Sequence, residues 1–102
     1  MRPYRKLKIE SLIQEELGRL FVRDIETQGA LLTIMGVAVA SDLQEATVSL
    51  GIIPVEKAGE ILMIINRRRR EFQFKLSRIM NIRPMPQLRF TVHEQESFLN
   101  TS

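Results

Sequence analysis

Four consecutive arginines, Arg67 to Arg70, form the densest group of one side-chain type in the chain. Each guanidinium carries a fixed positive charge and a planar fork of donors that can hold a phosphate through two hydrogen bonds. The stretch 67–89 contains eight basic side chains against one acid, Glu71. Charge runs are often only solvated faces, but so one-sided a run favours a polyanion as the partner.

Basic side chains from two parts of the chain are therefore the candidate nucleic-acid contacts. The main group is Arg67, Arg68, Arg69, Arg70, Lys75, Arg78 and Arg83, and the amino-terminal group is Arg5, Lys6 and Lys8, with Arg2 beside them. Residues 24–66 hold six acids and one base, so the net charge of +3 is unevenly spread. We predict a polarised molecule with one cationic patch.

Catalytic chemistry has little support in this sequence. There is no cysteine, and His93 is the only histidine, which excludes thiol catalysis, thiolate zinc sites and a pair of histidine metal ligands. His93 stands beside Glu94 and Glu96, and Asp42 and Glu45 share a turn, but neither pattern matches a known catalytic or metal-binding motif. We expect no enzyme activity, no metal and no cofactor, with Asp42 capping its turn.

The chain has 102 residues, which is the length of one domain. Hydrophobic residues make up 44% and charged residues 26%, as in ordinary globular proteins. No run approaches the roughly 20 apolar residues that span a bilayer, and no apolar segment follows the basic amino end. We predict a cytoplasmic protein with one domain over residues 5–93 and a polar tail over 94–102.

The elements that must position these side chains follow from hydrophobic periodicity. The expected elements are a helix over 5–23, a buried strand over 31–40, a strand over 46–52, helix over 56–80 and a strand over 87–92. Gly36 indicates a bulge or bend in the first strand, and the short turn after it predicts an antiparallel hairpin. Asn81 is a helix stop.

The long helical segment contains a conflict that predicts a break. Its apolar face runs through Ile61 and Ile65, and in a straight helix it would continue to Phe72 and Ile79 with Arg69 in its middle. An unpaired arginine in a core costs several kcal/mol. Either Arg69 extends its guanidinium outward from a straight helix, or the helix breaks within 66–70. We expect the break, because it also turns all four arginines toward solvent. Phe74 falls on the polar side, where we expect it to pack partly against its neighbours rather than to stack on a base, which is the alternative.

The order helix, strand, strand, helix, helix, strand predicts an α+β domain with helices on one face of a three-stranded sheet. This order matches the type II KH topology of single-strand nucleic-acid binders, in which a Gly-x-x-Gly turn clamps the backbone. No Gly-x-x-Gly occurs here. At this joint the chain has Asn66 followed by the four arginines, which could contact phosphates directly.

Two segments resemble the ribosome-binding factor A family. The first is residues 37–43, Val-Ala-Val-Ala-Ser-Asp-Leu, with Ala-Thr-Val at 46–48; the second is residues 82–90, Ile-Arg-Pro-Met-Pro-Gln-Leu-Arg-Phe. The likeness spans about residues 5–93. It implies a KH-like factor that binds the small ribosomal subunit, contacts 16S ribosomal RNA, supports late maturation and growth in the cold, and has neither catalytic residues nor a cofactor. Where the family has a small residue and a glycine at the helix joint, this chain has Arg68 to Arg70.

Three other functions compete with this one. One is a general KH-like module that binds single-stranded RNA outside the ribosome, which the missing glycine clamp disfavours. Another is a homodimer formed through the exposed edge of the short sheet. An enzyme is the last, for the reasons above. We expect a monomer that binds RNA and the small subunit, with no membrane and no small-molecule substrate as partner.

Overall fold

A computed structural model describes residues 3–93 of the chain, so the predicted tail and Arg2 lie outside the described residues. The elements are α1 (Pro3–Asp24), β1 (Leu31–Val39), β2 (Glu45–Ile53), a short 3-10 turn (Val55–Lys57), α2 (Ala58–Arg67), α3 (Arg69–Met80) and β3 (Gln87–Val92). Their order confirms the predicted one. Within residues 3–93, no helix has the length and apolar character needed to span a membrane.

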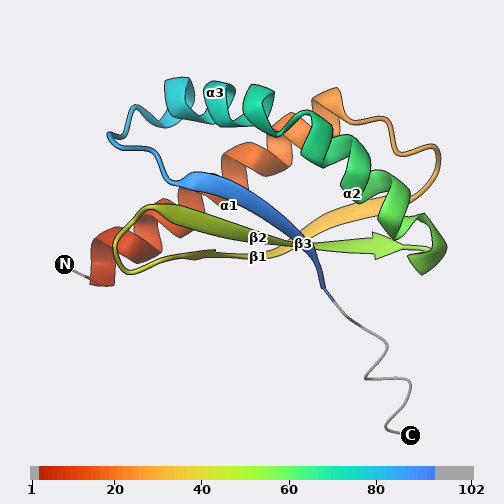
Figure 1. Cartoon of the computed structure of the whole chain (residues 1–102), viewed down its shortest axis with the longest axis horizontal. Coiled ribbons are helices and arrows are strands. Elements are labelled where there is room, and N and C mark those ends of the chain that lie inside the picture. Colours follow the sequence, from red (N-terminus) through yellow and green to blue (C-terminus); the bar gives the residue numbers. More distant parts are fainter. Residues whose placement is uncertain (1–2, 94–102) are drawn as a thin grey trace, which may run out of the picture.

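The three strands form one mixed sheet in the order β1-β2-β3. β1 and β2 pair antiparallel, with Val39 opposite Ala46, whereas β2 and β3 pair parallel, with Val48 opposite Phe90. The parallel pair requires a crossover connection, which α2 and α3 supply. All three helices lie on one side of the sheet (Figure 1). The α+β, type II KH-like architecture is confirmed.

The core lies between the helices and the inner face of the sheet. Ile13 and Leu17 of α1 and Phe72 and Leu76 of α3 are fully buried. The Phe21 ring meets the Phe72 ring edge-on, with 5.3 Å between centroids. The predicted apolar face of α1 is therefore confirmed, and α1 and α3 share one aromatic contact over the sheet.

Two predictions about burial are wrong. β1 is not a buried strand, because it lies at the edge of the sheet and alternates between exposed and half-buried residues. Ile79 does not continue the apolar face and is 50% exposed. The buried positions of α3 are spaced by four from Phe72 to Leu76, with Met80 half-buried, and this spacing turns Ile79 outward.

The predicted turns are confirmed. The register of β1 shifts between Ile34 and Gly36, which is the expected irregularity. An Asp42 carboxylate oxygen accepts a hydrogen bond from the Gln44 N–H at 3.0 Å, so Asp42 holds the hairpin turn. Asn81 ends α3 in the left-handed conformation at φ 52°.

Candidate nucleic-acid interface

The helical segment breaks at Arg68, as predicted. This residue has φ −105° and ψ 15°, and it separates α2 from α3. The Arg68 N–H donates to the Ile65 carbonyl at 3.0 Å. This hydrogen bond joins residues three apart, as in a 3-10 turn, and ends α2. Its own carbonyl accepts from the Phe72 N–H at 3.1 Å and so begins α3. Because the chain changes direction here, Ile65 and Phe72 are both buried in the core, and Arg69 does not enter the core with them.

The break does not turn all four arginines toward solvent, and that prediction is wrong for Arg68. Its side chain is only 32% exposed and makes a bidentate pair with Glu71 at 2.9 and 2.7 Å. It also donates to the backbone carbonyl of Asp24 at 2.6 Å and lies over the Phe72 ring, 5.2 Å from the centroid. The carboxyl end of α1 leaves carbonyl groups without helical partners, and a guanidinium is well suited to satisfy one.

Lys75 belongs to the same internal cluster. Its ammonium donates to carboxylate oxygens of Asp24 at 3.0 Å and Glu71 at 2.9 Å. Hydrogen bonds from Arg23 and Lys75 lower the pKa of Asp24 to about 2. Those from Arg68 and Lys75 lower the pKa of Glu71 to about 2. Arg68 and Lys75 thus neutralise two carboxylates and join α3 to the end of α1.

The other basic residues of this region point their charge outward. Arg67, Arg70, Arg78 and Arg83 are exposed, and Arg69 is half-buried. None of the five forms an ion pair with an acid among residues 3–93. We call these five side chains the free arginine group.

The structure corrects the expectation for Phe74. It is 62% exposed rather than partly packed, and the Arg78 guanidinium lies 5.6 Å from its ring centroid. Arg70, Phe74 and Arg78 follow one another at intervals of four, so they form a single stripe on α3. That spacing was the available signal, because it surrounds an aromatic ring with arginines.

A surface hollow of about 520 Å³ adjoins this stripe. It is lined by Arg69, Arg70, Gln73, Phe74, Ser77 and Gln87. The Gln73 amide fixes its inner wall, because it donates to the Pro86 carbonyl and accepts from the Leu88 N–H, each at 2.8 Å. The hollow therefore lies where α3 meets the start of β3, and we call it the α3–β3 hollow.

The amino-terminal candidates lie apart from the α2–α3 joint. Arg5 and Lys8 are exposed and Lys6 is half-buried, all near the start of α1. The other end of α1 contacts Arg68 through Asp24. At 1.5 Å per residue, these three side chains begin about 24 to 29 Å along the helix from that contact. Figure 1 shows the start of α1 well away from the α2–α3 joint, so the amino-terminal candidates do not share one patch with the arginines of that joint.

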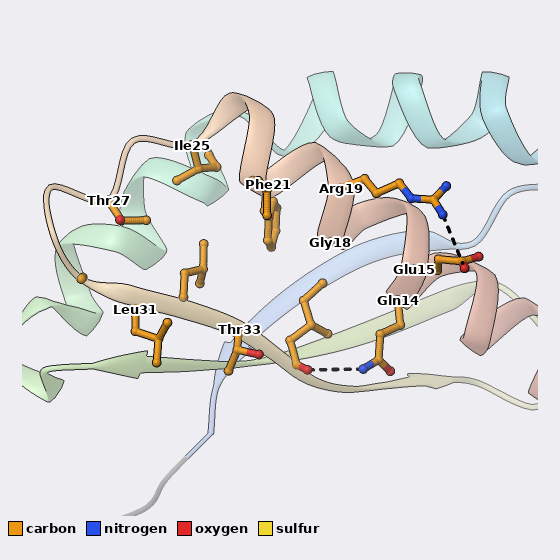
Figure 2. A pocket seen from close by; sticks show the side chains of 13 residues that line it. Gln14, Glu15, Gly18, Arg19, Phe21, Ile25, Thr27, Leu31 and Thr33 are labelled. Carbon is orange, nitrogen blue, oxygen red and sulfur yellow. Dashed lines mark hydrogen bonds and ion pairs between the residues drawn. The ribbon is translucent and has the colours of Figure 1, made fainter.

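A larger hollow, about 780 Å³, lies between α1 and β1 and contains none of the predicted contacts (Figure 2). Its wall is mainly apolar, and its charged side chains, Glu15 and Arg19, pair with each other at 3.6 Å. Gln14 donates to the Ile34 carbonyl at 3.3 Å at one side of it. Glu10 accepts from the Val39 N–H at 2.8 Å. Side chains of α1 thus occupy part of the open edge of β1.

Among the described residues weighed for catalysis, Asp42 and Glu45 line one hollow, but each already has a partner. Asp42 holds its turn, and Glu45 pairs with Arg89 at 2.9 Å. His93 is exposed at the end of β3, where its N–H donates to the Leu50 carbonyl at 2.6 Å. Glu94 and Glu96 lie outside the described residues. Within residues 3–93, no three acidic or histidine side chains gather in a way that could hold a metal ion.

Comparisons with known proteins agree with this fold. The family model described as ribosome-binding factor A matches residues 5–99. Ribosome-binding factor A of Prosthecochloris aestuarii is 37% identical over 91 residues, covering 86% of this chain and 75% of that protein. The crystal structure of ribosome-binding factor A from Thermus thermophilus superposes with a TM-score of 0.71 at 22% identity, over 85% of this chain and 94% of that one.

A second Thermus thermophilus structure is similar, with a TM-score of 0.69 at 22% identity over 82% of this chain and 90% of that one. It is described as ribosome-binding factor A fitted into a cryo-electron microscopy map of its complex with the 30S subunit. These two likenesses concern the fold. The family model, by contrast, covers nearly the whole chain. The chain belongs to the ribosome-binding factor A family.

Proposed function

We propose that this protein binds the small ribosomal subunit and contacts 16S ribosomal RNA through the free arginine group. The observation that carries the proposal is a set of five arginines without acidic partners in residues 3–93, which lie on α3 or within three residues of its ends. The related Thermus thermophilus protein, which was fitted into a map of a 30S complex, supports the small subunit as the partner. The protein acts without catalysis, in the cytoplasm, during late subunit maturation, and supports growth in the cold.

The mechanism of binding is electrostatic. Each phosphate that an arginine neutralises releases condensed counterions, so the logarithm of affinity falls by roughly 0.7 to 0.9 per contact for each tenfold rise in salt. Five contacts give a slope of about −3.5 to −4.5. Raising the salt from about 50 to 200 mM then weakens binding by roughly 100- to 500-fold. Specificity comes from RNA shape and from neighbouring proteins of the subunit.

Arg68 and Lys75 serve this function indirectly. Their charges are already matched by Asp24 and Glu71, so a phosphate would have to compete with carboxylates that they hold at 2.7 to 3.0 Å. We assign them the task of fixing α3 against α1, which sets the direction in which Arg70 and Arg78 point. Arg5, Lys6 and Lys8 remain candidates for a second, separate contact.

A monomeric protein is supported by hydrogen bonds that side chains make to the backbone of both edge strands. Glu10 and Gln14 occupy backbone groups of β1, and Gln73 occupies the Leu88 N–H of β3. A second chain that paired with either edge would have to displace these hydrogen bonds. This arrangement disfavours a homodimer formed by edge pairing, and sedimentation equilibrium at rising protein concentration tests it.

Co-sedimentation with small subunits in sucrose gradients tests the proposed function. The variant Arg69→Gln/Arg70→Gln removes two charges of the free arginine group, whereas Arg19→Gln/Arg89→Gln removes two exposed charges elsewhere. We expect the first variant to lose most subunit association at moderate salt and the second to behave as the unchanged protein. Equal association of both variants with the subunit would assign binding to another surface.

Association that is equally strong with free, unstructured RNA would favour the alternative of a general single-strand binder. Enrichment on immature subunits rather than mature ones tests the maturation part of the proposal. These two comparisons use the same gradients and need no further variant.

A further inference from the structure

The exposed ring of Phe74 is the least expected feature of the α3–β3 hollow. Large apolar side chains on a surface usually lie against neighbouring side chains, but 62% of this one is open to water. Its neighbours at intervals of four are arginines, and no other aromatic ring of the described residues lines the hollow. An aromatic ring between cations is a common arrangement for holding an unpaired base together with its phosphates.

We propose that the α3–β3 hollow binds one unpaired nucleotide of an RNA strand, with the base stacked on Phe74. This inference rests on the proposed function and adds to it a site for a single-stranded segment. Arg69 and Arg70 bind the flanking phosphates, since both line the hollow and neither is paired with an acid among residues 3–93. Arg78 lies over the ring at 5.6 Å, which adds a cation–π contact to the stack.

The walls of the hollow are compatible with this ligand. Its volume of about 520 Å³ is within the range of small-ligand sites. Gln73 is held at both amide atoms by the start of β3, so the base of the hollow is fixed rather than free to collapse. Ser77 and Gln87 add a hydroxyl and an amide that can reach the edge of a base or a ribose.

The charge of the hollow selects an anionic strand. Two unpaired guanidiniums line it, and none of the six lining residues is an acid. The nearby acid Glu71 is held by Arg68 and Lys75. A stacking contact accepts any base, so the site should show little sequence preference. It therefore recognises a single-stranded segment of RNA by its exposed base and its backbone together.

Binding of two hexanucleotides tests the proposal. One is hexauridylate and the other an abasic ribose-phosphate hexamer with the same number of phosphates, each labelled for fluorescence anisotropy at low salt. We expect Phe74→Leu to weaken hexauridylate binding by about 5- to 150-fold and to leave the abasic hexamer unchanged. Phe74→Tyr should retain most of the affinity. Arg70→Gln should weaken both oligomers and reduce the salt slope by about 0.7.

Two results would count against the stacking site. Equal binding of hexauridylate to the Phe74→Leu variant and the unchanged protein would overturn it, as would equal losses on both oligomers. Ile79→Leu is the matched control, because Ile79 is exposed on the same helix but does not line the hollow. Loss of stacking with intact co-sedimentation would leave the proposed function standing. Loss of co-sedimentation in the Arg69→Gln/Arg70→Gln variant, by contrast, would test the phosphate contacts and not the stacking of a base on Phe74.

Discussion

Two arginines only two residues apart should have opposite roles, and substitution of each by methionine separates them. Arg68→Met removes a guanidinium that donates to the Asp24 carbonyl at 2.6 Å and lies over the Phe72 ring. A hydrogen bond from a charged donor contributes about 1.5 to 3 kcal/mol, and the cation–π contact about 0.5 to 1 kcal/mol. The pair with Glu71 adds little, since both side chains are partly in water. Together these losses predict a decrease of about 2 to 4 kcal/mol in the free energy of unfolding.

Arg70→Met removes the same charge from an exposed side chain with no acidic partner among residues 3–93. Surface changes of this kind alter stability by less than about 0.5 kcal/mol. Urea denaturation measures both variants, and Arg68→Met should also show a melting temperature lower by roughly 8 to 32 °C. RNA affinity should show the reverse order. Arg70→Met should reduce the salt slope by about 0.7 to 0.9 at a temperature where both variants are folded, and Arg68→Met should not.

Equal stabilities of the two variants would refute the structural role given to Arg68. A loss of RNA affinity in Arg68→Met that matches the loss in Arg70→Met, measured well below both melting temperatures, would refute the division between the internal cluster and the free arginine group. The methionine is chosen because its length and flexibility preserve most of the packing of the arginine stem.

Two further predictions concern the contacts that hold α3 in place. The pKa values of Asp24 and Glu71 are both lowered to about 2, below their values in the unfolded chain. These two carboxylates therefore stabilise the fold above about pH 4.5, and this stabilisation is lost as the pH falls toward 2. The midpoint of urea denaturation should drop over this pH range, and it should drop by less in the Asp24→Asn variant. Gln73→Leu leaves the Pro86 carbonyl and the Leu88 N–H without their partner and should destabilise the fold by about 1 to 3 kcal/mol; an unchanged thermal melt would show that the amide does not hold β3.

Local patterns in the sequence predicted most of the fold. The apolar spacing of α1, the turn at Asp42, the irregularity at Gly36 and the left-handed stop at Asn81 each depend on a few neighbouring residues. The break within 66–70 could also be predicted, because burial of an unpaired arginine is costly whatever the rest of the fold. These features require no knowledge of what lies across the molecule.

The misses depend on residues far apart in the chain. β1 was expected to be buried because its composition is apolar, but its place at the sheet edge depends on which strand pairs with β2 on the other side. Arg68 turns inward because the end of α1, 44 residues earlier, provides a carbonyl acceptor. None of these partners can be read from the neighbouring sequence.

Four consecutive arginines at a helix joint need not destabilise it by charge repulsion, because the joint points their side chains in different directions. Successive residues of a helix point about 100° apart, and the break at Arg68 adds a change of direction. One arginine can therefore turn inward to join the end of α1 while those beside it face outward. The inward residue holds α3 to the core, and α3 in turn presents Arg70, Phe74 and Arg78 as one stripe. In a chain that lacks the glycine clamp of ordinary KH modules, the same arginine run thus supplies both the support and the contacts of the proposed RNA site.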